Sequence, residues 1–231
     1  MAKSSFPGFH PRCIQFLDEL ASNNNRDWFQ KNKTRYESDV LEPALAFVEA
    51  MQEPLKKVSP HFLAVPKRVG GSLMRIYRDT RFAKDKTPYK TNVGIHFRHE
   101  KGKDVHAPGF YVHLSAEECF VGCGIWHPDS SALQKIRKTI DKDPATWKRV
   151  SRGKAFTNHF QLAGDSLKRP PRGYKAEHPM IDDLKRKDFI ALCDLDYDEL
   201  FDKSVVKNIT AKMKKAAPLV RFLCGAIRVK Y

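Results

Sequence analysis

Residues 92–98 read N-V-G-I-H-F-R, and residues 110–115 read F-Y-V-H-L-S. In both stretches an apolar residue alternates with a polar or small one, which is the period-2 pattern of a strand with one buried face. Residues 119–126 predict a further strand, and Ser115–Glu118 is a short link that predicts a hairpin between the last two. Sequential strands with short links predict an antiparallel sheet.

Helical patterns lie on both sides of this stretch. Apolar residues recur at helical spacing near the N-terminus, in residues 11–22 and 40–57. Asn25 is expected to cap a further helix, with Asp27 in its first turn. Pro218 is expected to interrupt or kink a long C-terminal helix.

Weaker patterns predict the remaining elements. Helices are expected after Asp129 or Ser130 and from Pro144 to Val150, and residues 151–179 read as irregular. We expect short strands at 73–77 and 189–193 and a short helix at 182–187. We therefore expect an α+β fold, with an antiparallel sheet in the middle of the chain flanked by N-terminal and C-terminal helices. No internal repeat or linker divides the sequence, so residues 1–231 are expected to form one domain.

Composition narrows the function classes. The chain has a formal net charge of +15, and residues 203–231 contain eight Lys or Arg and no acidic residue. This charge favours acidic partners such as nucleic acid, nucleotides or an anionic surface. No apolar run approaches the ~20 residues that span a bilayer, so we expect no membrane insertion. Met1–Gly8 lacks the apolar core of a signal peptide, and five cysteines fit reduced thiols, so we expect a cytoplasmic protein.

Residues 75–90, R-I-Y-R-D-T-R-F-A-K-D-K-T-P-Y-K, hold the strongest functional signal. Six cations are interleaved with three aromatic residues and one proline, which restrict where the charged groups point. Arg offers a planar fork that matches phosphate or carboxylate. This pattern predicts an anion site, with Asp79 orienting a guanidinium group. The expected ligand-binding residues are Arg75, Arg78, Asp79, Arg81, Lys86, Tyr89, Lys90 and Arg172.

A purely structural interpretation of the same segment stays open. In that interpretation, Arg–Asp pairs hold the loop to the sheet and bind no ligand. The two interpretations are compatible, because a carboxylate often fixes the position of a ligand-binding Arg.

Other residues support only weaker hypotheses. His96, His113 and His127 lie on or beside three predicted strands, but no histidine pair has the compact spacing of a zinc motif, so we assign no metal. Tyr111 and Trp126, together with Phe110, are candidates for stacking against bases. No nucleotide-binding or hydrolase motif is present, so the sequence assigns no cofactor and no catalytic residue.

Three functions remain as alternatives. The first is binding of a phosphate- or carboxylate-bearing ligand through the Arg/Lys-rich loop. The second is a metal-assisted hydrolase or transferase that uses Asp79 or Asp85 with a histidine. The third is a nucleic-acid accessory or protein-interaction module that uses the basic surface. The sequence decides neither the ligand nor the oligomeric state.

Five short motifs together resemble one known family. They are F-P-G-F (6–9), N-N-x-R-x-W-F (23–29), R-D-x-R-F-x-x-D-K-x-P-Y-K (78–90), G-x-W-x-P (124–128) and P-R-G-Y (171–174). This order resembles the uncharacterised bacterial and fungal family called domain of unknown function twenty-four sixty-one. The resemblance implies one family-wide domain over about residues 6–227. It implies no activity, cofactor or catalytic residue.

Overall fold

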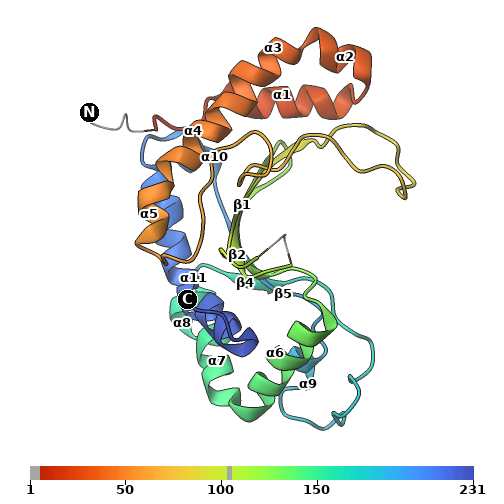
Figure 1. The fold of residues 1–231 in the computed structure, drawn as a ribbon, viewed down its shortest axis with the longest axis vertical. Coiled ribbons are helices and arrows are strands. Elements are labelled where there is room, and N and C mark those ends of the chain that lie inside the picture. Colours follow the sequence, from red (N-terminus) through yellow and green to blue (C-terminus); the bar gives the residue numbers. More distant parts are fainter. Residues whose placement is uncertain (1–5, 103–105) are drawn as a thin grey trace.

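A five-stranded antiparallel sheet organises the molecule, which was analysed as a computed structural model that describes residues 6–102 and 106–231. The strand order is β1-β2-β3-β5-β4. β1, β2 and β3 form a meander. β5, which follows several helices in the chain, pairs with the free side of β3 (Figure 1). The bounds are β1 Asn92–Arg98, β2 Gly109–Ser115, β3 Cys119–Ile125, β4 Gln161–Ala163 and β5 Phe189–Asp194. The predicted α+β fold with a central antiparallel sheet is confirmed.

Helices before the sheet follow the predicted caps. Pro11 occupies the first turn of α1, and the Asn25 side chain accepts a 2.9 Å hydrogen bond from the Trp28 amide at the start of α2. The helix predicted over 40–57 consists of three shorter segments, the first of them a π-helical turn. The bounds are α1 Pro11–Ser22, α2 Arg26–Lys31, α3 Lys33–Tyr36, η1 Glu37–Leu41, α4 Glu42–Ala50 and α5 Gln52–Lys56.

Helices after β3 complete the fold. Asp129 caps α6 by accepting a 2.8 Å hydrogen bond from the Ala132 amide. The long α11 continues through Pro218, so this residue does not interrupt the helix, and a kink at Pro218 stays a prediction. No helix among the described residues combines the length and apolar character that crossing a membrane requires. The bounds are α6 Ser130–Lys142, α7 Pro144–Arg152, α8 Lys154–Thr157, α9 Ile181–Leu184, α10 Tyr197–Phe201 and α11 Val205–Ile227.

Two other local predictions need correction. Residues 73–77 form no strand and make only two isolated bridges, Leu73 with Ile95 and Tyr77 with Tyr89. The region 151–179 is not wholly irregular, because it contains α8 and β4. Both errors concern segments whose structure depends on distant partners, β1 for Leu73 and β5 for β4.

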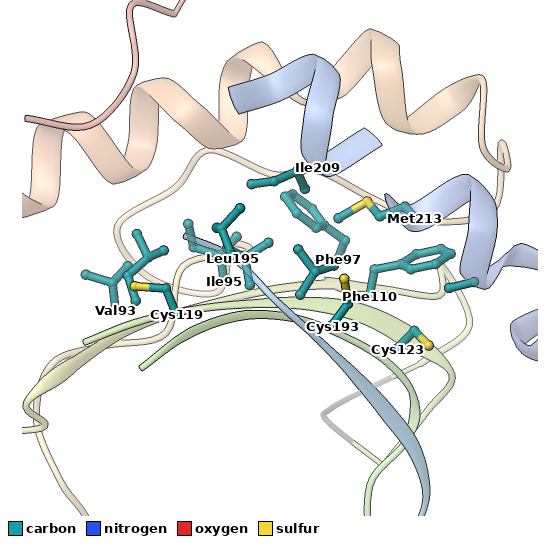
Figure 2. Packing of buried hydrophobic residues seen from close by; sticks show 14 of the residues in the cluster. Val93, Ile95, Phe97, Phe110, Cys119, Cys123, Cys193, Leu195, Ile209 and Met213 are labelled. Carbon is teal, nitrogen blue, oxygen red and sulfur yellow. The ribbon is translucent and has the colours of Figure 1, made fainter. Parts of the chain in front are cut away.

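The core lies on one face of the sheet. In-register neighbours Ile95, Val112, Val121 and Cys193 form a buried row across four strands. Figure 2 shows side chains of this face directed toward α11, where Ile209 and Met213 cover them. The alternating residues of the same strands therefore project from the opposite, concave face, which is turned away from α11 (Figure 1).

All five cysteines are buried and unpaired. They are Cys13, Cys119, Cys123, Cys193 and Cys224. Burial raises the pKa of the Cys13, Cys123 and Cys224 thiols to about 12, which keeps them protonated. All five are therefore small core residues.

Candidate ligand-binding site

A cavity of about 410 Å³ lies on the concave face of the sheet. Its floor is an in-register row, His96 on β1, Tyr111 on β2, Gly122 on β3 and Leu192 on β5. We call this the aromatic cavity. Its other lining residues are Met74, Gly109, His113, Phe120, Cys123, Gly124, Trp126 and Ile190.

Missing side chains explain why the sheet is hollow here. Gly109, Gly122 and Gly124 all line the cavity and contribute no side chain. A Cβ at Gly94 would lie only 2.6 Å from the hydroxyl of Tyr111, so that ring depends on the glycine beneath it. A Cβ at Gly109 would collide in the same way with the ring of His96. The glycines thus let two rings lie flat against the sheet.

One wall of the cavity is a polar and aromatic cluster. The rings of His113 and Phe120 stack with centroids 4.7 Å apart. The Tyr111 hydroxyl lies 3.3 Å from His113 Nδ1, and Asn92 Nδ2 lies 3.5 Å from the same nitrogen. Burial lowers the pKa of His113 and raises that of Tyr111 to about 12, so both side chains are held neutral. This wall offers hydrogen bonds and ring faces and no charge.

Residues 76–90 form a projecting ribbon, which we call the basic arm (Figure 1, yellow). Its two sides are joined near the base by the Arg78 amide donating to Pro88 and the Lys90 amide donating to Ile76. Tyr89 anchors it, because its ring stacks on Phe29 with centroids 4.1 Å apart. The Asn24 side chain also bonds both the amide and the carbonyl of Tyr89, at 3.1 and 2.9 Å.

Ion pairs within the arm neutralise two of its arginines. Asp79 accepts from Arg81 Nε at 3.0 Å and from Nη2 at 2.7 Å, and these bonds lower its pKa to about 2. Arg78 pairs with Asp85 and also contacts Thr87. Lys86 donates to the carbonyl of Thr80 at 2.9 Å. The arm therefore contains Arg–Asp pairs as the structural interpretation expects, although they hold the arm together and do not hold it to the sheet.

Two cations lie close to each other at the base of the arm. Within the described chain, no carboxylate lies within ion-pair distance of Arg75 or Lys90. Lys90 is half-buried, and desolvation followed by repulsion from Arg75 lowers its pKa. The repulsion between Arg75 and Lys90 is unfavourable, although Asp79, whose pKa is lowered chiefly by Arg81 and in smaller part by Arg75, reduces the field at Arg75. An anion between them would offset that cost.

The structure thus divides the residues predicted to bind a ligand. Arg78, Asp79, Arg81 and Lys86 lie together in the arm, and Arg75 and Lys90 lie near each other at its base. Tyr89 is turned into the core. Arg172 is exposed on the segment between β4 and α9, which extends from the other end of the sheet in Figure 1. Arg172 therefore does not join the group at the arm.

Within the described residues, two histidines and a glutamate form a cluster with metal-like geometry. Ligand atoms of His61, His99 and Glu100 lie within 4.8 Å of one another. His99 Nε2 lies 2.8 Å from the carbonyl of Lys230, and Nδ1 accepts from the Lys101 amide at 3.1 Å. Since both ring nitrogens of His99 are in hydrogen bonds, neither has a lone pair to give to a metal. This cluster is a structural contact between the sheet edge and the C-terminal residues.

Sequence reasoning found some lining residues and missed others. It identified Tyr111, Trp126 and Phe110 as stacking candidates. Tyr111 and Trp126 line the cavity, whereas Phe110 is fully buried in the core. Ile190 and Leu192 were missed, because their place beside β3 depends on a pairing across about seventy residues. The sequence signal for the cavity-facing positions was the series of polar or small residues that alternates with the apolar residues of each strand.

Comparison with known proteins identifies the family and no activity. The family model for DUF2461, described as a conserved hypothetical protein, matches residues 12–222. Neither the curated proteins nor the solved structures gave a match to this chain. Two motifs that carry the resemblance meet in space, since Asn24 and Phe29 of one hold Tyr89 of the other. The match spans most of the sequence, and the chain therefore belongs to the DUF2461 family.

Proposed function

We propose that the protein binds a small anionic ligand with a ring or other apolar body. The body occupies the aromatic cavity, and the phosphate or carboxylate group lies at Arg75 and Lys90. The observation that carries the proposal is the half-buried Lys90 beside Arg75 without a described carboxylate partner. Asp85 and Asp79 offset the charges of Arg78 and Arg81, and the bonds of Arg81 to Asp79 leave its Nη1 for a further acceptor.

Chain connectivity supports placing the two parts in one site. Met74, which lines the cavity, directly precedes Arg75. Asn92, which contacts His113 in the cavity wall, follows Lys90 by two residues. Two residues of extended chain span roughly 7 Å. A ligand the size of a nucleotide or an aryl phosphate is long enough to contact both.

Ligand screening with matched variants tests the proposal. Nucleotides, aryl phosphates and aromatic carboxylates are to be titrated by calorimetry, with inorganic phosphate as the probe for the anion alone. A charge-assisted hydrogen bond contributes ~1.5–3 kcal/mol, so Lys90→Ala and Arg75→Ala should each weaken a true ligand by about 10- to 150-fold. Lys84→Ala is the control, because this exposed lysine of the arm is in none of the described ion pairs.

A second variant tests the cavity independently of charge. Gly94→Ala places a methyl group against the Tyr111 hydroxyl and should push that ring into the cavity. We expect this variant to lose the ring-bearing ligand and to keep any weak affinity for inorganic phosphate. Equal ligand affinity in all four variants and the wild type, or no binding by any compound, would refute the proposal.

Nucleic-acid binding is a second candidate, favoured by the tip of the arm. Phe82 is 95% exposed, and the Arg81 guanidinium lies 5.8 Å from its ring centroid. Stacking of a base on an aromatic side chain contributes ~1–3 kcal/mol. Phe82→Ala should therefore weaken single-stranded oligonucleotides by about 5- to 150-fold without changing the salt slope, and should leave heparin binding unchanged. Equal losses for oligonucleotide and heparin would reduce this candidate to non-specific attraction by the +15 charge.

We also propose a cytoplasmic location. Five buried, protonated thiols without a disulfide support a reducing compartment. Fractionation of the native host would test it, and recovery in an exported fraction would refute it.

A further inference from the structure

We propose that a groove between α4–α5 and α11 binds an amphipathic helix of a partner protein, with one acidic and one basic edge. The groove has a volume of about 600 Å³ and is lined by residues of these three helices, and we call it the lysine groove. It lies on the α11 side of the sheet, whereas the aromatic cavity lies on the opposite face (Figure 1). The inference therefore does not depend on the proposed function.

Small side chains make the floor of the lysine groove. Ala211 of α11 lines it together with Ala50 and Pro54 of α4 and α5, and none of the three is buried. At the bottom the two walls touch, because the hydroxyl of Thr210 lies 3.9 Å from the sulfur of Met51. The floor is thus apolar and open to contact from outside.

Lysines follow the α11 wall at helical spacing. Lys207 and Lys214 are seven residues apart, which is about two turns, so they lie on the same side of α11. Lys203 adds a charge four residues before Lys207, and Lys57 lines the groove at the end of α5. All of these lysines are exposed. No carboxylate of the described chain lies within ion-pair distance of any of them.

The facing wall is acidic. Glu49 and Glu53 lie four residues apart along α4 and α5, about one turn, and both line the groove. Glu53 pairs with Lys56 of its own helix at 2.8 Å, so the pair does not cross the groove. A nucleic acid or an anionic membrane attracted by Lys207 would be repelled by Glu49. Walls of opposite charge instead favour a partner that carries both charges on separate edges.

Helical spacing on both walls indicates that the partner segment is itself a helix. Two helices that lie side by side have the same rise of about 1.5 Å per residue. Acidic residues at i and i+7 of the partner therefore match Lys207 and Lys214, and basic residues at i and i+4 match Glu49 and Glu53. Apolar residues between the two edges would contact Ala211. Helix-in-groove recognition uses these same anchor spacings.

A synthetic helical peptide tests the proposal with the full-length chain. The peptide has leucines along one ridge, glutamates along one neighbouring edge and lysines along the other, and an isomer of the same composition alternates both charges along both edges. In fluorescence anisotropy, we expect the sorted peptide to bind roughly 10-fold more tightly than the isomer, because half of the isomer's charge pairs are repulsive. Equal affinity for the two peptides, or no binding of either, would overturn the proposal.

Charge reversal identifies the wall that is used. The double variant Lys207→Glu, Lys214→Glu should weaken the sorted peptide by about 10- to 50-fold and should strengthen a peptide with lysines on both edges. The matched control is Lys215→Glu, Lys230→Glu, because both lysines are exposed, lie outside the groove and give the same change in net charge. We expect at most about a 2-fold effect in this control, since screening by salt weakens distant charges. Equal losses in the two double variants would reduce the binding to general attraction and overturn the site.

A second kind of variant blocks the floor and leaves the charges unchanged. Ala211→Trp places a large ring in the groove from an exposed position, so the fold is kept, and circular dichroism checks this. It should abolish binding of the sorted peptide. Sedimentation of the wild type that shows a dimer, dissociated by Ala211→Trp, would assign the groove to a second copy of the chain and overturn the partner helix. A greater loss of affinity for an oligonucleotide or anionic vesicles than for the peptide, in Lys207→Glu, Lys214→Glu, would overturn it in favour of a polyanion.

Discussion

Removing the side chain of Asn24 should loosen the basic arm from the helices that hold it. Asn24 donates from Nδ2 to the Tyr89 carbonyl at 2.9 Å and accepts the Tyr89 amide at 3.1 Å. The Asn24 side chain thus satisfies both the amide and the carbonyl of Tyr89, as the backbone of a neighbouring strand would. Tyr89 is 3% exposed. Asn24→Ala leaves both groups without this partner.

The expected cost follows from the two lost bonds. Leaving a buried donor or acceptor unsatisfied costs about 1–3 kcal/mol, and because Asn24 itself is partly exposed, the sum for the two part-buried bonds is about 2–4 kcal/mol. Unfolding entropy scales with length, so for 231 residues each kcal/mol shifts Tm by about 2 °C. Asn24→Ala should therefore lower Tm by about 4–8 °C.

Urea denaturation followed by circular dichroism measures the free energy of unfolding, and amide hydrogen exchange at Tyr89 measures local opening of the arm. The matched control is Asn23→Ala, because Asn23 is exposed and its side chain donates only to the carbonyl of Glu19, at 2.9 Å. We expect a change of at most about 0.5 kcal/mol in the control. Equal stability of the two variants, with unchanged exchange at Tyr89, would refute the anchoring role of Asn24.

Two other outcomes follow from the structure. The pKa values of Asp79 and Asp85 are lowered from 3.8 to about 2, chiefly by the bonds from Arg81 to Asp79 and from the Thr87 amide to Asp85. The contribution of these two carboxylates to the stability of the arm is therefore present above about pH 4 and is lost as the pH falls through about 2. NMR shifts of the arm should follow this titration, and Asp79→Asn should remove the Arg81 part of it; shifts that are flat from pH 5 to 2 would contradict the pairing. Pro218→Ala should raise the free energy of unfolding by about 1–3 kcal/mol in urea, because the exposed proline lacks the amide that would bond within α11, and a destabilised variant would show that its ring contributes packing.

Local patterns were sufficient to predict most of the sheet. The alternation at Val93, Ile95 and Phe97 predicted both the strand and its buried face. In a strand that is buried on one face only, every second residue is apolar. The same alternation placed Tyr111 on the concave face. What local patterns did not give is the position of β5 between β3 and β4, which depends on pairing between distant segments.

The candidate site was predictable in composition and not in arrangement. The density of cations in residues 75–90 indicated the arm, but the sequence did not tell which of them would pair with Asp79 and Asp85 and which would remain without a carboxylate. The contact of His127 with Asp188 joins residues 61 positions apart. The periodicity of the sequence does not predict such a contact, because the contact forms only when the end of β3 lies beside the start of β5.

The segment before the arm has a protective consequence for the sheet. Ser72–Met74 runs along the outer edge of β1, where the Met74 amide donates to Gly94 and the His96 amide donates to Ser72. An uncovered strand edge is a template for pairing with other chains, and this cover occupies part of the outer edge of β1. At the opposite edge, β4 has only three residues. Such a sheet exposes little backbone to a second molecule, so a highly concentrated solution should resist growth of fibrils by edge-to-edge addition.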